Sequence, residues 1–304
     1  MSETIKDLVL LSRHYENWAT LALNYVRKRP SRVVILKDGT RINSSSGIRS
    51  LSALANLLQN GWKINHFDDR YLLLENLDGI RIKCRMNIGN DIGHLVEIFV
   101  TAEYSSQFAN KTVLDIGMSN GDSSIYFAKS GGRIVIGVEP YPESFELANE
   151  NVILNHLEGK VIVLNCGLSS SLRQEDLKVS SESPNANSLK ANPSTKASNL
   201  FDIQLKIRTI TIDEIISRYD LKTIDLLKMD CEGCEYDVIR SLSPKTLDLI
   251  EEIILEFHEG PQDLVEILSR NQFRIEVKNT TKKNAITSMG YIRARRIRAP
   301  VKIA

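Results

Sequence analysis

The fold of this chain is decided by the segment TVLDIGMSNGD at residues 112–122. Its first residues are mostly apolar and predict a short buried strand, and a helix is predicted to start near Asp122. Gly117 and Gly121 frame the turn between them. Glycine permits unusual dihedrals and a close approach of the backbone to a ligand, and a helix N-terminus supplies free N–H groups. The segment therefore predicts a strand, turn and helix that hold a small molecule on the backbone.

From Lys111 onward, predicted strands and helices alternate along the chain. One helix opens with a capping-box pattern, because Glu214 follows Thr211 by three residues. The remaining strands are predicted at residues 133–139, 160–167, 205–210, 223–230, 249–259, 273–279 and 288–297. This order predicts an α/β protein with a Rossmann-like, mostly parallel sheet of about seven strands, helices on both faces and a closing pair of strands.

The first third of the chain has a different pattern. We expect a small α+β appendage over residues 1–110 and a Rossmann-like domain over 111–304. The appendage is predicted to contain helices at 4–29 and 48–60, a hairpin at 33–42 and strands at 71–74 and 80–84. Residues 169–202 are rich in Ser, Asn, Lys and Pro and predict a long loop, either a surface insertion or a lid over the substrate.

The composition is that of an ordinary globular protein. The 304 residues are 42% apolar and 25% charged, and the net charge of +1 indicates neither a nucleic-acid nor a membrane partner. No apolar run predicts a membrane span. The N-terminal sequence has no cleavable signal pattern, so we expect a mature cytoplasmic protein. The four cysteines predict no disulfide framework. Cys231 and Cys234 form a C-x-x-C pair, which suits either structural zinc or, as we favour, small packing residues.

A second acidic residue indicates that the glycine segment binds an adenosyl ligand. Glu139 ends the next predicted strand, 24 residues after Asp115, and an acid there can accept both hydroxyls of a ribose. The NAD fingerprint needs a glycine where Ser119 stands, and a P-loop needs a G-K-[ST] sequence that is absent. Asp115 would repel a phosphate but suits the cationic amino group of methionine. These points favour S-adenosylmethionine. The candidate cofactor-binding residues are Asp115, Gly117, Ser119, Asn120, Gly121, Glu139, Pro140 and Asp230.

Several motifs together resemble the FkbM family of methyltransferases. They are the glycine turn, Glu139-Pro140, Thr211-Ile212-Asp213, the run KMDCEGCE at residues 228–235 and Glu256-Phe257-His258. The K-x-D-x-E-G-x-E pattern is far more specific than the glycine turn, and the resemblance covers about residues 95–296. It implies S-adenosylmethionine as cofactor, cofactor contacts at the turn and at Glu139, and Asp230 beside the cofactor. The chain departs from the family pattern at Met118-Ser119 and at the two cysteines, where small apolar residues are usual.

The strand ends carry the candidate catalytic residues. Ligands of open α/β sheets bind beyond the carboxyl ends of the strands, so Asp230, Glu232, Glu256 and His258 should converge near Gly117. His258 is the candidate general base, because an ordinary imidazole titrates near neutral pH. Glu232 is expected to hold His258, to orient the acceptor, or to cap the helix that starts at Cys234. Several carboxylates in one crevice could bind a divalent metal, but no ligand spacing demands one, so no metal is predicted.

The sequence thus predicts a methyltransferase, with O-methylation of a hydroxyl on a small molecule or glycan as the favoured reaction. A hydroxyl acceptor must be aligned with the methyl carbon and must lose its proton. A nucleic-acid methyltransferase is the first alternative, suggested by four arginines within residues 293–298 but weakened by the lack of interleaved aromatic residues. The second alternative is an inactive cofactor-binding partner protein, against which Asp115, Glu139, Asp230 and His258 are all present.

Overall fold

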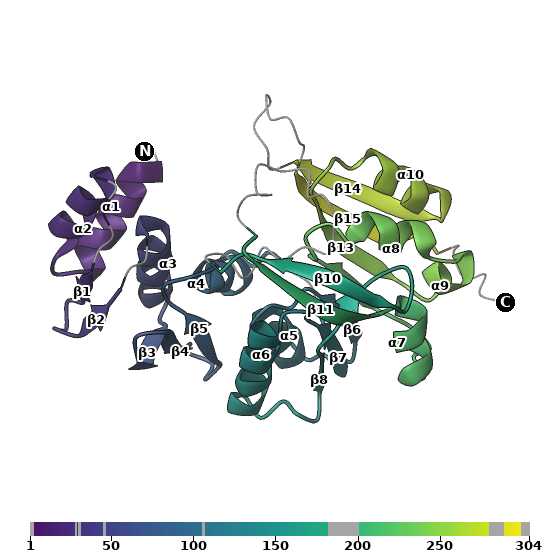
Figure 1. Ribbon diagram of the computed structural model, residues 1–304, viewed down its shortest axis with the longest axis horizontal. Helices are drawn as coiled ribbons and strands as arrows, with labels where there is room; N and C mark the ends of the chain where they lie inside the picture. Colours follow the sequence, from purple (N-terminus) through teal and green to yellow (C-terminus); the bar gives the residue numbers. More distant parts are fainter. Residues whose placement is uncertain are drawn as a thin grey trace.

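The computed structural model describes residues 3–27, 29, 32–44, 47–104, 107–181, 201–279 and 289–298. Figure 1 shows the N-terminal helices and hairpins at one end of the molecule and a large sheet with its helices at the other. Among these residues, no helix has the length and apolar character needed to cross a membrane.

Seven strands form the central sheet, as the sequence predicts. Their spatial order is β14 (Phe273–Asn279), β15 (Gly290–Arg296), β13 (Glu252–Phe257), β12 (Leu226–Met229), β6 (Thr112–Ile116), β7 (Ile134–Val138) and β8 (Val161–Leu164). Strand β15 runs antiparallel to both of its neighbours, and every other neighbouring pair is parallel. The sheet is therefore the Rossmann-like sheet of the class I methyltransferase fold, with the closing pair at one edge.

Alternate residues of the central strands enter two separate apolar clusters, which shows that both faces of the sheet are covered. Val113 and Val135 belong to a cluster with α5 (Asp122–Lys129) and α6 (Pro142–Leu154). Leu114 and Ile136 belong to the cluster on the other face. The helices of that second face are α7 (Ile212–Arg218), α8 (Glu235–Ser241), α9 (Pro244–Asp248) and α10 (Gln262–Arg270). The predicted cap of α7 is confirmed, since Thr211 accepts a hydrogen bond from the Glu214 N–H.

A smaller three-stranded sheet lies outside the central one. It contains β10 (Gln174–Val179), β11 (Ile203–Ile210) and β9 (Gly167–Leu168). The prediction of an unbroken loop over 169–202 is wrong at β10, because Leu177 and Val179 alternate with polar residues and pack against apolar side chains of β11. Residues 182–200 of that predicted loop lie outside the described residues.

The N-terminal part is an α+β unit. Its elements are α1 (Glu3–His14), α2 (Trp18–Val26), β1 (Val33–Ile35), β2 (Arg41–Asn43), α3 (Ile48–Gln59), β3 (Lys63–Phe67), β4 (Tyr71–Glu75), β5 (Arg81–Arg85), α4 (Asp91–Leu95) and the π-helix η1 (Val96–Val100). The predicted hairpin, second helix and two later strands are present. The prediction of one helix over residues 4–29 is wrong: the chain breaks at Tyr15, which is fully buried and donates its hydroxyl to the Leu51 carbonyl.

The N-terminal unit is joined to the sheet by two asparagines of α6. Asn155 bonds both the N–H and the carbonyl of Arg81, and Asn151 does the same at Lys83. These side chains satisfy the open edge of β5 as a neighbouring strand would. The apolar cluster on this face also runs without interruption from Leu11 to the sheet. As a result α4 lies between the N-terminal elements and the sheet (Figure 1).

Candidate active site

A cavity of about 290 Å³ lies beyond the carboxyl ends of the central strands. Its wall is built by the turns after β6, β7 and β12, by β13 and β15, by the small sheet and by α4 with η1. The small sheet contributes Gly167, Leu168 and Leu177, and the other parts contribute polar residues: Asn90, His94, Glu97, Glu103, Ser119, Asp122, Ser123, Glu139, Lys228, Asp230, Glu232, Glu256 and Tyr291. This is the position where open α/β sheets bind their ligands.

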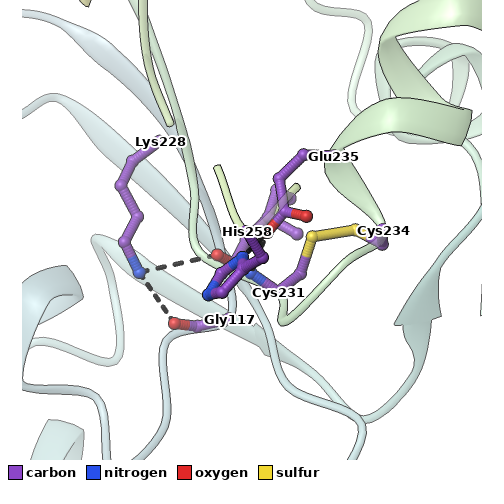
Figure 2. Close-up of a disulfide and its surroundings, with 7 residues drawn as sticks. Gly117, Lys228, Cys231, Cys234, Glu235 and His258 are labelled. Atoms are coloured by element: carbon purple, nitrogen blue, oxygen red, sulfur yellow. Dashed lines mark hydrogen bonds and ion pairs between the residues drawn. A yellow bond between two sulfur atoms is a disulfide. The ribbon is translucent and has the colours of Figure 1, made fainter. Parts of the chain in front are cut away.

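The turn after β6 passes very close to the end of β12. Gly117 has a positive φ of 75°, and a Cβ atom built on it would lie 1.8 Å from the Asp230 carbonyl oxygen. Only glycine fits this approach. The Gly117 carbonyl accepts a hydrogen bond of 2.7 Å from Lys228 Nζ, and Figure 2 shows the lysine pointing at this turn. The turn is thus fixed from two sides by the strand that carries the K-x-D-x-E-G-x-E pattern.

Asp115 and Lys228 form a buried ion pair across neighbouring strands. They are directly opposite in the β6–β12 register, and Lys228 Nζ lies 3.2 Å from Asp115 Oδ1. The hydroxyls of Ser123 and Ser124 each donate to Asp115 Oδ2 at 2.6 Å. Burial by itself would lower the pKa of Lys228, but the nearby aspartates, Asp115 foremost, raise it above its usual value. Asp115 is fully buried, so its cationic partner in the structure is Lys228.

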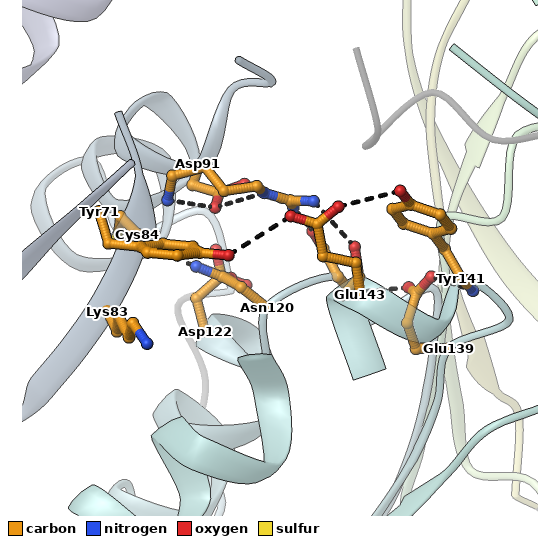
Figure 3. Close-up of polar contacts among 12 residues, drawn as sticks. Tyr71, Lys83, Cys84, Asp91, Asn120, Asp122, Glu139, Tyr141 and Glu143 are labelled. Atoms are coloured by element: carbon orange, nitrogen blue, oxygen red, sulfur yellow. Dashed lines mark hydrogen bonds and ion pairs between the residues drawn. The ribbon is translucent and has the colours of Figure 1, made fainter. Parts of the chain in front are cut away.

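Glu139 lies at the cavity wall with both oxygens held by backbone. Oε2 accepts from the Ser119 N–H and Oε1 from the Tyr141 N–H, each at 2.9 Å. Burial raises the pKa of this carboxyl to about 7, against the lowering effect of those two bonds. Figure 3 shows Glu139 beside Tyr141 at the start of α6. A carboxylate fixed in this way can accept hydrogen bonds from ligand hydroxyls without moving.

A second buried ion pair ties the N-terminal unit to the same turn. Arg85 and Asp91 are almost fully buried and pair at 2.9 Å. The same guanidinium donates to the hydroxyls of Ser144 at 3.1 Å and of Ser119 at 3.3 Å. One side chain of β5 therefore contacts both the glycine turn and the first turn of α6.

Carboxylates gather at the other end of the cavity. Burial, followed by the charge of Asp230, raises the pKa of Glu256 to about 9 and that of Glu232 to about 8. Glu103 also contributes to the shift of Glu256. Such shifts arise where like charges share a site of restricted solvation, so this end of the cavity favours positive charge or added protons.

His258 stands among these acids. Its Nε2 lies 3.3 Å from Glu232 Oε2, and its Nδ1 lies 3.8 Å from Oε1 of the fully buried Glu235. Asp230, Glu256 and His258 also present potential ligand atoms that lie within 4.8 Å of one another. Glu232 faces the cavity, and His258 lies directly against Glu232.

Cys231 and Cys234 are joined by a disulfide, shown in Figure 2. The sequence prediction of two separate packing residues is therefore wrong, although Cys234 does pack in the apolar cluster of the second face. The bond is possible because Glu232 and Gly233 both have positive φ, which turns the chain back and places the cysteine Cα atoms 5.5 Å apart. Glu235 Oε1 accepts the Cys231 N–H at 3.0 Å and closes the same turn.

The cavity wall contains most of the predicted cofactor residues: Gly117, Ser119, Glu139, Pro140 and Asp230. Asn120 is instead fully buried and donates to Cys84 Sγ. Gly121 permits close packing of α5 on α6, because a Cβ atom there would lie 3.2 Å from Ala148. At the start of α8, Cys234 makes no side-chain cap bond and Glu235 holds the turn, so the capping role of Glu232 stays a prediction.

Sequence reasoning missed several wall residues. Asp122 begins α5, and burial raises its pKa to about 8. The sequence indicates Lys228 only as part of a motif, although a lone charged residue in a strand of buried apolar residues signals a buried partner. His94, Glu103 and Tyr291 come from segments without a recognisable motif.

Known proteins resemble the part of the chain that forms this site. Residues 115–275 match the methyltransferase FkbM domain. The hexuronic acid methyltransferase AglP of Haloferax volcanii is 29% identical over 145 residues, which are 47% of this chain and 56% of that protein. Methyltransferase 1 of Beauveria bassiana is 25% identical over 55% of this chain and 73% of its own length. The chain thus spans little more than half of the Haloferax protein.

A solved structure of a methyltransferase FkbM from Methylobacillus flagellatus KT has a TM-score of 0.41 and 17% sequence identity, covering 64% of this chain and 46% of that one. The domain match extends over more than half of the chain. The chain therefore belongs to the FkbM family of methyltransferases.

Proposed function

We propose that this protein is an S-adenosylmethionine-dependent O-methyltransferase that acts on a hydroxyl of a small molecule or glycan. One observation carries the proposal: a single cavity joins a backbone-held carboxylate, Glu139, to a carboxylate–histidine cluster at Glu232 and His258. The first group suits a ribose and the second suits a hydroxyl that must lose a proton.

The residues around the glycine turn fit the proposed cofactor. The Glu139 carboxylate is already aligned by two backbone bonds and would accept the ribose hydroxyls. The Asp230 carbonyl occupies the place that a Gly117 side chain would need, so the turn presents its backbone to the cavity. When bound, S-adenosylmethionine supplies an electrophilic methyl group on a cationic sulfonium. The acidic end of the cavity, with Asp230 and Glu256, favours that positive charge.

Proton removal is assigned to the pair formed by Glu232 and His258. Glu232 reaches the cavity, and its 3.3 Å contact with His258 provides a neighbour that shares the proton. Glu235 lies on the other side of the imidazole and limits its rotation. The pair follows the general arrangement in which a base is oriented by a third group.

The proposed acceptor class follows from the chemistry of the cavity and from the Haloferax relative, whose name gives a hexuronic acid as its substrate. Sugars present the hydroxyls that this pair could deprotonate. We also propose that residues 1–110 form an appendage to the methyltransferase domain, and that its segment around α4 and η1 helps to shape the acceptor side through His94 and Glu103.

The arginine-rich segment gives no support to a nucleic-acid acceptor. Arg293 and Arg295 both pair with Glu252, and Arg296 pairs with Asp248. Arg298 pairs with Glu251. Charges neutralised within the protein attract phosphate only weakly.

The experiment is transfer of a labelled methyl group from S-adenosylmethionine to a panel of hexuronic acids, neutral sugars, catechols and RNA. Label in a hydroxyl-bearing acceptor, lost in the Glu139→Ala variant, supports the proposal. Label only in RNA, or cofactor binding with no transfer to any class, contradicts it. The Glu175→Ala variant is the matched control, since Glu175 bonds Ser169 and Arg173 away from the cavity wall.

A further inference from the structure

We propose that Asp230, Glu256 and His258 form a divalent-cation site at the acceptor end of the cavity. The sequence alone predicted no metal, because these residues lie on two different strand ends and show no ligand spacing. The fold brings them together, since β12 and β13 are parallel neighbours and both end at the cavity.

The geometry of the three residues suits one ion. Their candidate ligand atoms lie within 4.8 Å of one another. Two ligands of the same ion cannot be farther apart than twice the metal–ligand distance, and metal–oxygen distances of about 2.0–2.6 Å set that limit at roughly 4–5 Å. An ion between the three groups therefore needs only small side-chain adjustments.

The ligand chemistry selects the class of ion. Two carboxylates and one imidazole form a mixed oxygen–nitrogen set, which suits Mn²⁺, Fe²⁺ or Zn²⁺ better than Ca²⁺. Three protein ligands leave coordination positions for other oxygens. Glu232 and Glu103 add further carboxylates near Asp230 and Glu256. The buried Lys228 also lies near Asp230, but its ion pair is with Asp115.

A buried carboxylate lies behind the histidine. Glu235 is fully buried, and its Oε1 lies 3.8 Å from His258 Nδ1. Its Oε2 is buried without a hydrogen-bond partner. A carboxylate behind a histidine is the usual arrangement that orients a metal-bound imidazole. Glu235 is in turn fixed to the Cys231 N–H, within the turn closed by the disulfide (Figure 2).

This inference rests on the proposed function and narrows its acceptor class. An ion with open positions binds best to two adjacent oxygens, so the acceptor would be a vicinal diol or an α-hydroxy acid, as in a uronic acid. The ion would lower the pKa of the hydroxyl. With His258 bound to the ion, Glu232 alone would accept the proton. The acceptor oxygen would bond to the methyl carbon, and the electron pair of the broken carbon–sulfur bond would stay on sulfur.

The test is Mn²⁺ binding to the full chain, measured by electron paramagnetic resonance and calorimetry without cofactor or acceptor. We expect one ion per chain, and at least tenfold weaker binding in Asp230→Asn, Glu256→Gln and His258→Gln. Glu97→Gln is the matched control, because it removes a charge from the same cavity without removing a proposed ligand. Its affinity should change by less than about threefold, because a charge that does not touch the ion acts on it only through screened electrostatics.

Absence of bound Mn²⁺ at 1:1 stoichiometry in the folded wild-type chain would overturn the site. An equal loss of affinity in Glu97→Gln and Asp230→Asn would also overturn it, since that result indicates general attraction by negative charge. The variants are checked for folding by thermal melting. Mn²⁺ binding without any methyl transfer would reject the proposed function but keep the site, and methyl transfer that resists a chelator would reject the site but keep the function.

Discussion

Gly117 and Asp230 approach each other so closely that a Cβ atom at Gly117 would lie 1.8 Å from the Asp230 carbonyl oxygen. The Gly117→Ala variant must therefore shift either the turn or the end of β12, and it places a side chain at a φ of 75°. We expect a loss of more than about 2 kcal/mol in the free energy of unfolding, together with at least tenfold weaker binding of S-adenosylmethionine. Urea unfolding and calorimetry measure the two effects.

Gly159→Ala is the control for that experiment, since a Cβ atom there meets nothing within 4 Å. Its unfolding free energy should stay close to that of the wild type. Equal stability of the two variants would show that the turn yields easily and that the contact does not fix the cavity.

The buried pair of Lys228 and Asp115 gives a second prediction. Lys228→Met leaves the Asp115 charge without its partner in a fully buried place. Breaking a buried pair in this way costs about 3–5 kcal/mol, and the Gly117 carbonyl loses its donor as well. Arg218→Gln, which breaks the exposed pair with Glu214, should change stability by no more than about 0.5 kcal/mol. Similar losses in both variants, measured by urea unfolding, would contradict this account.

The pair also shows where prediction from sequence succeeds and where it stops. Strands β6 and β12 were predictable because buried parallel strands are short, nearly continuous apolar runs. The partner of Asp115 could not be predicted from the sequence, because Lys228 lies far along the chain and meets Asp115 only through the β6–β12 register. Sequence reasoning assigned Asp115 to the cofactor, since a lone acid at a strand end looks available until its neighbour is known.

The candidate catalytic residues were easier to find than their surroundings. Parallel strands end at one edge of a sheet, so the meeting of Asp230, Glu232 and His258 followed from their places after predicted strands. The contribution of the first third of the chain had no such signal. Arg85 reaches Ser119 only because the asparagines of α6 hold β5 in place. Contacts of this kind depend on packing between segments and leave no local pattern.

Glu139 gives a pH prediction for cofactor binding. Burial raises the pKa of this carboxyl to about 7 from an ordinary value of 4.5. Only the carboxylate accepts both ribose hydroxyls, so affinity for S-adenosylmethionine should weaken as the pH falls below about 7. In the Glu139→Gln variant, affinity should be lower and should depend less on pH between 5.5 and 8.5, roughly one and a half units either side of that pKa. Calorimetry at a series of pH values measures both. An unchanged pH profile in the variant would assign the titration to another group.

The same shift predicts a stability effect of definite sign. The unfolded chain releases the Glu139 proton near pH 4.5 and the folded chain near pH 7. Between these values the folded state binds more protons, so the contribution of Glu139 to stability falls as the pH rises. The unfolding free energy of the wild type minus that of Glu139→Gln should therefore decrease from pH 5 to pH 7. An increase in this difference would contradict the raised pKa of Glu139.

The disulfide between Cys231 and Cys234 should stabilise the protein only modestly. The bridge closes a very short loop, with a sequence separation of 3, and loop-closure entropy then amounts to about 2 kcal/mol. The double variant Cys231→Ser/Cys234→Ser should lose up to that amount, and reductant should shift the wild type to the same melting temperature. Cys166→Ser, which changes a free cysteine, should respond to reductant as the wild type does. A wild type that is insensitive to reductant would show that the two thiols are not bonded in solution.

The last prediction concerns proton removal by Glu232 and His258. If this pair takes the acceptor proton, Glu232→Gln and His258→Ala should each lower kcat by about 10²–10⁴-fold. The affinity for S-adenosylmethionine should stay within about threefold of wild type, a change of less than 1 kcal/mol in binding free energy, because neither substitution alters Glu139 or the glycine turn. His66→Ala is the control, since His66 is an exposed residue of β3. Full turnover in either site variant would exclude that residue as the base. Loss of cofactor affinity in parallel with kcat would instead show that the pair supports the cavity as a whole, since a group that acts only on the acceptor proton leaves binding of the free cofactor unchanged.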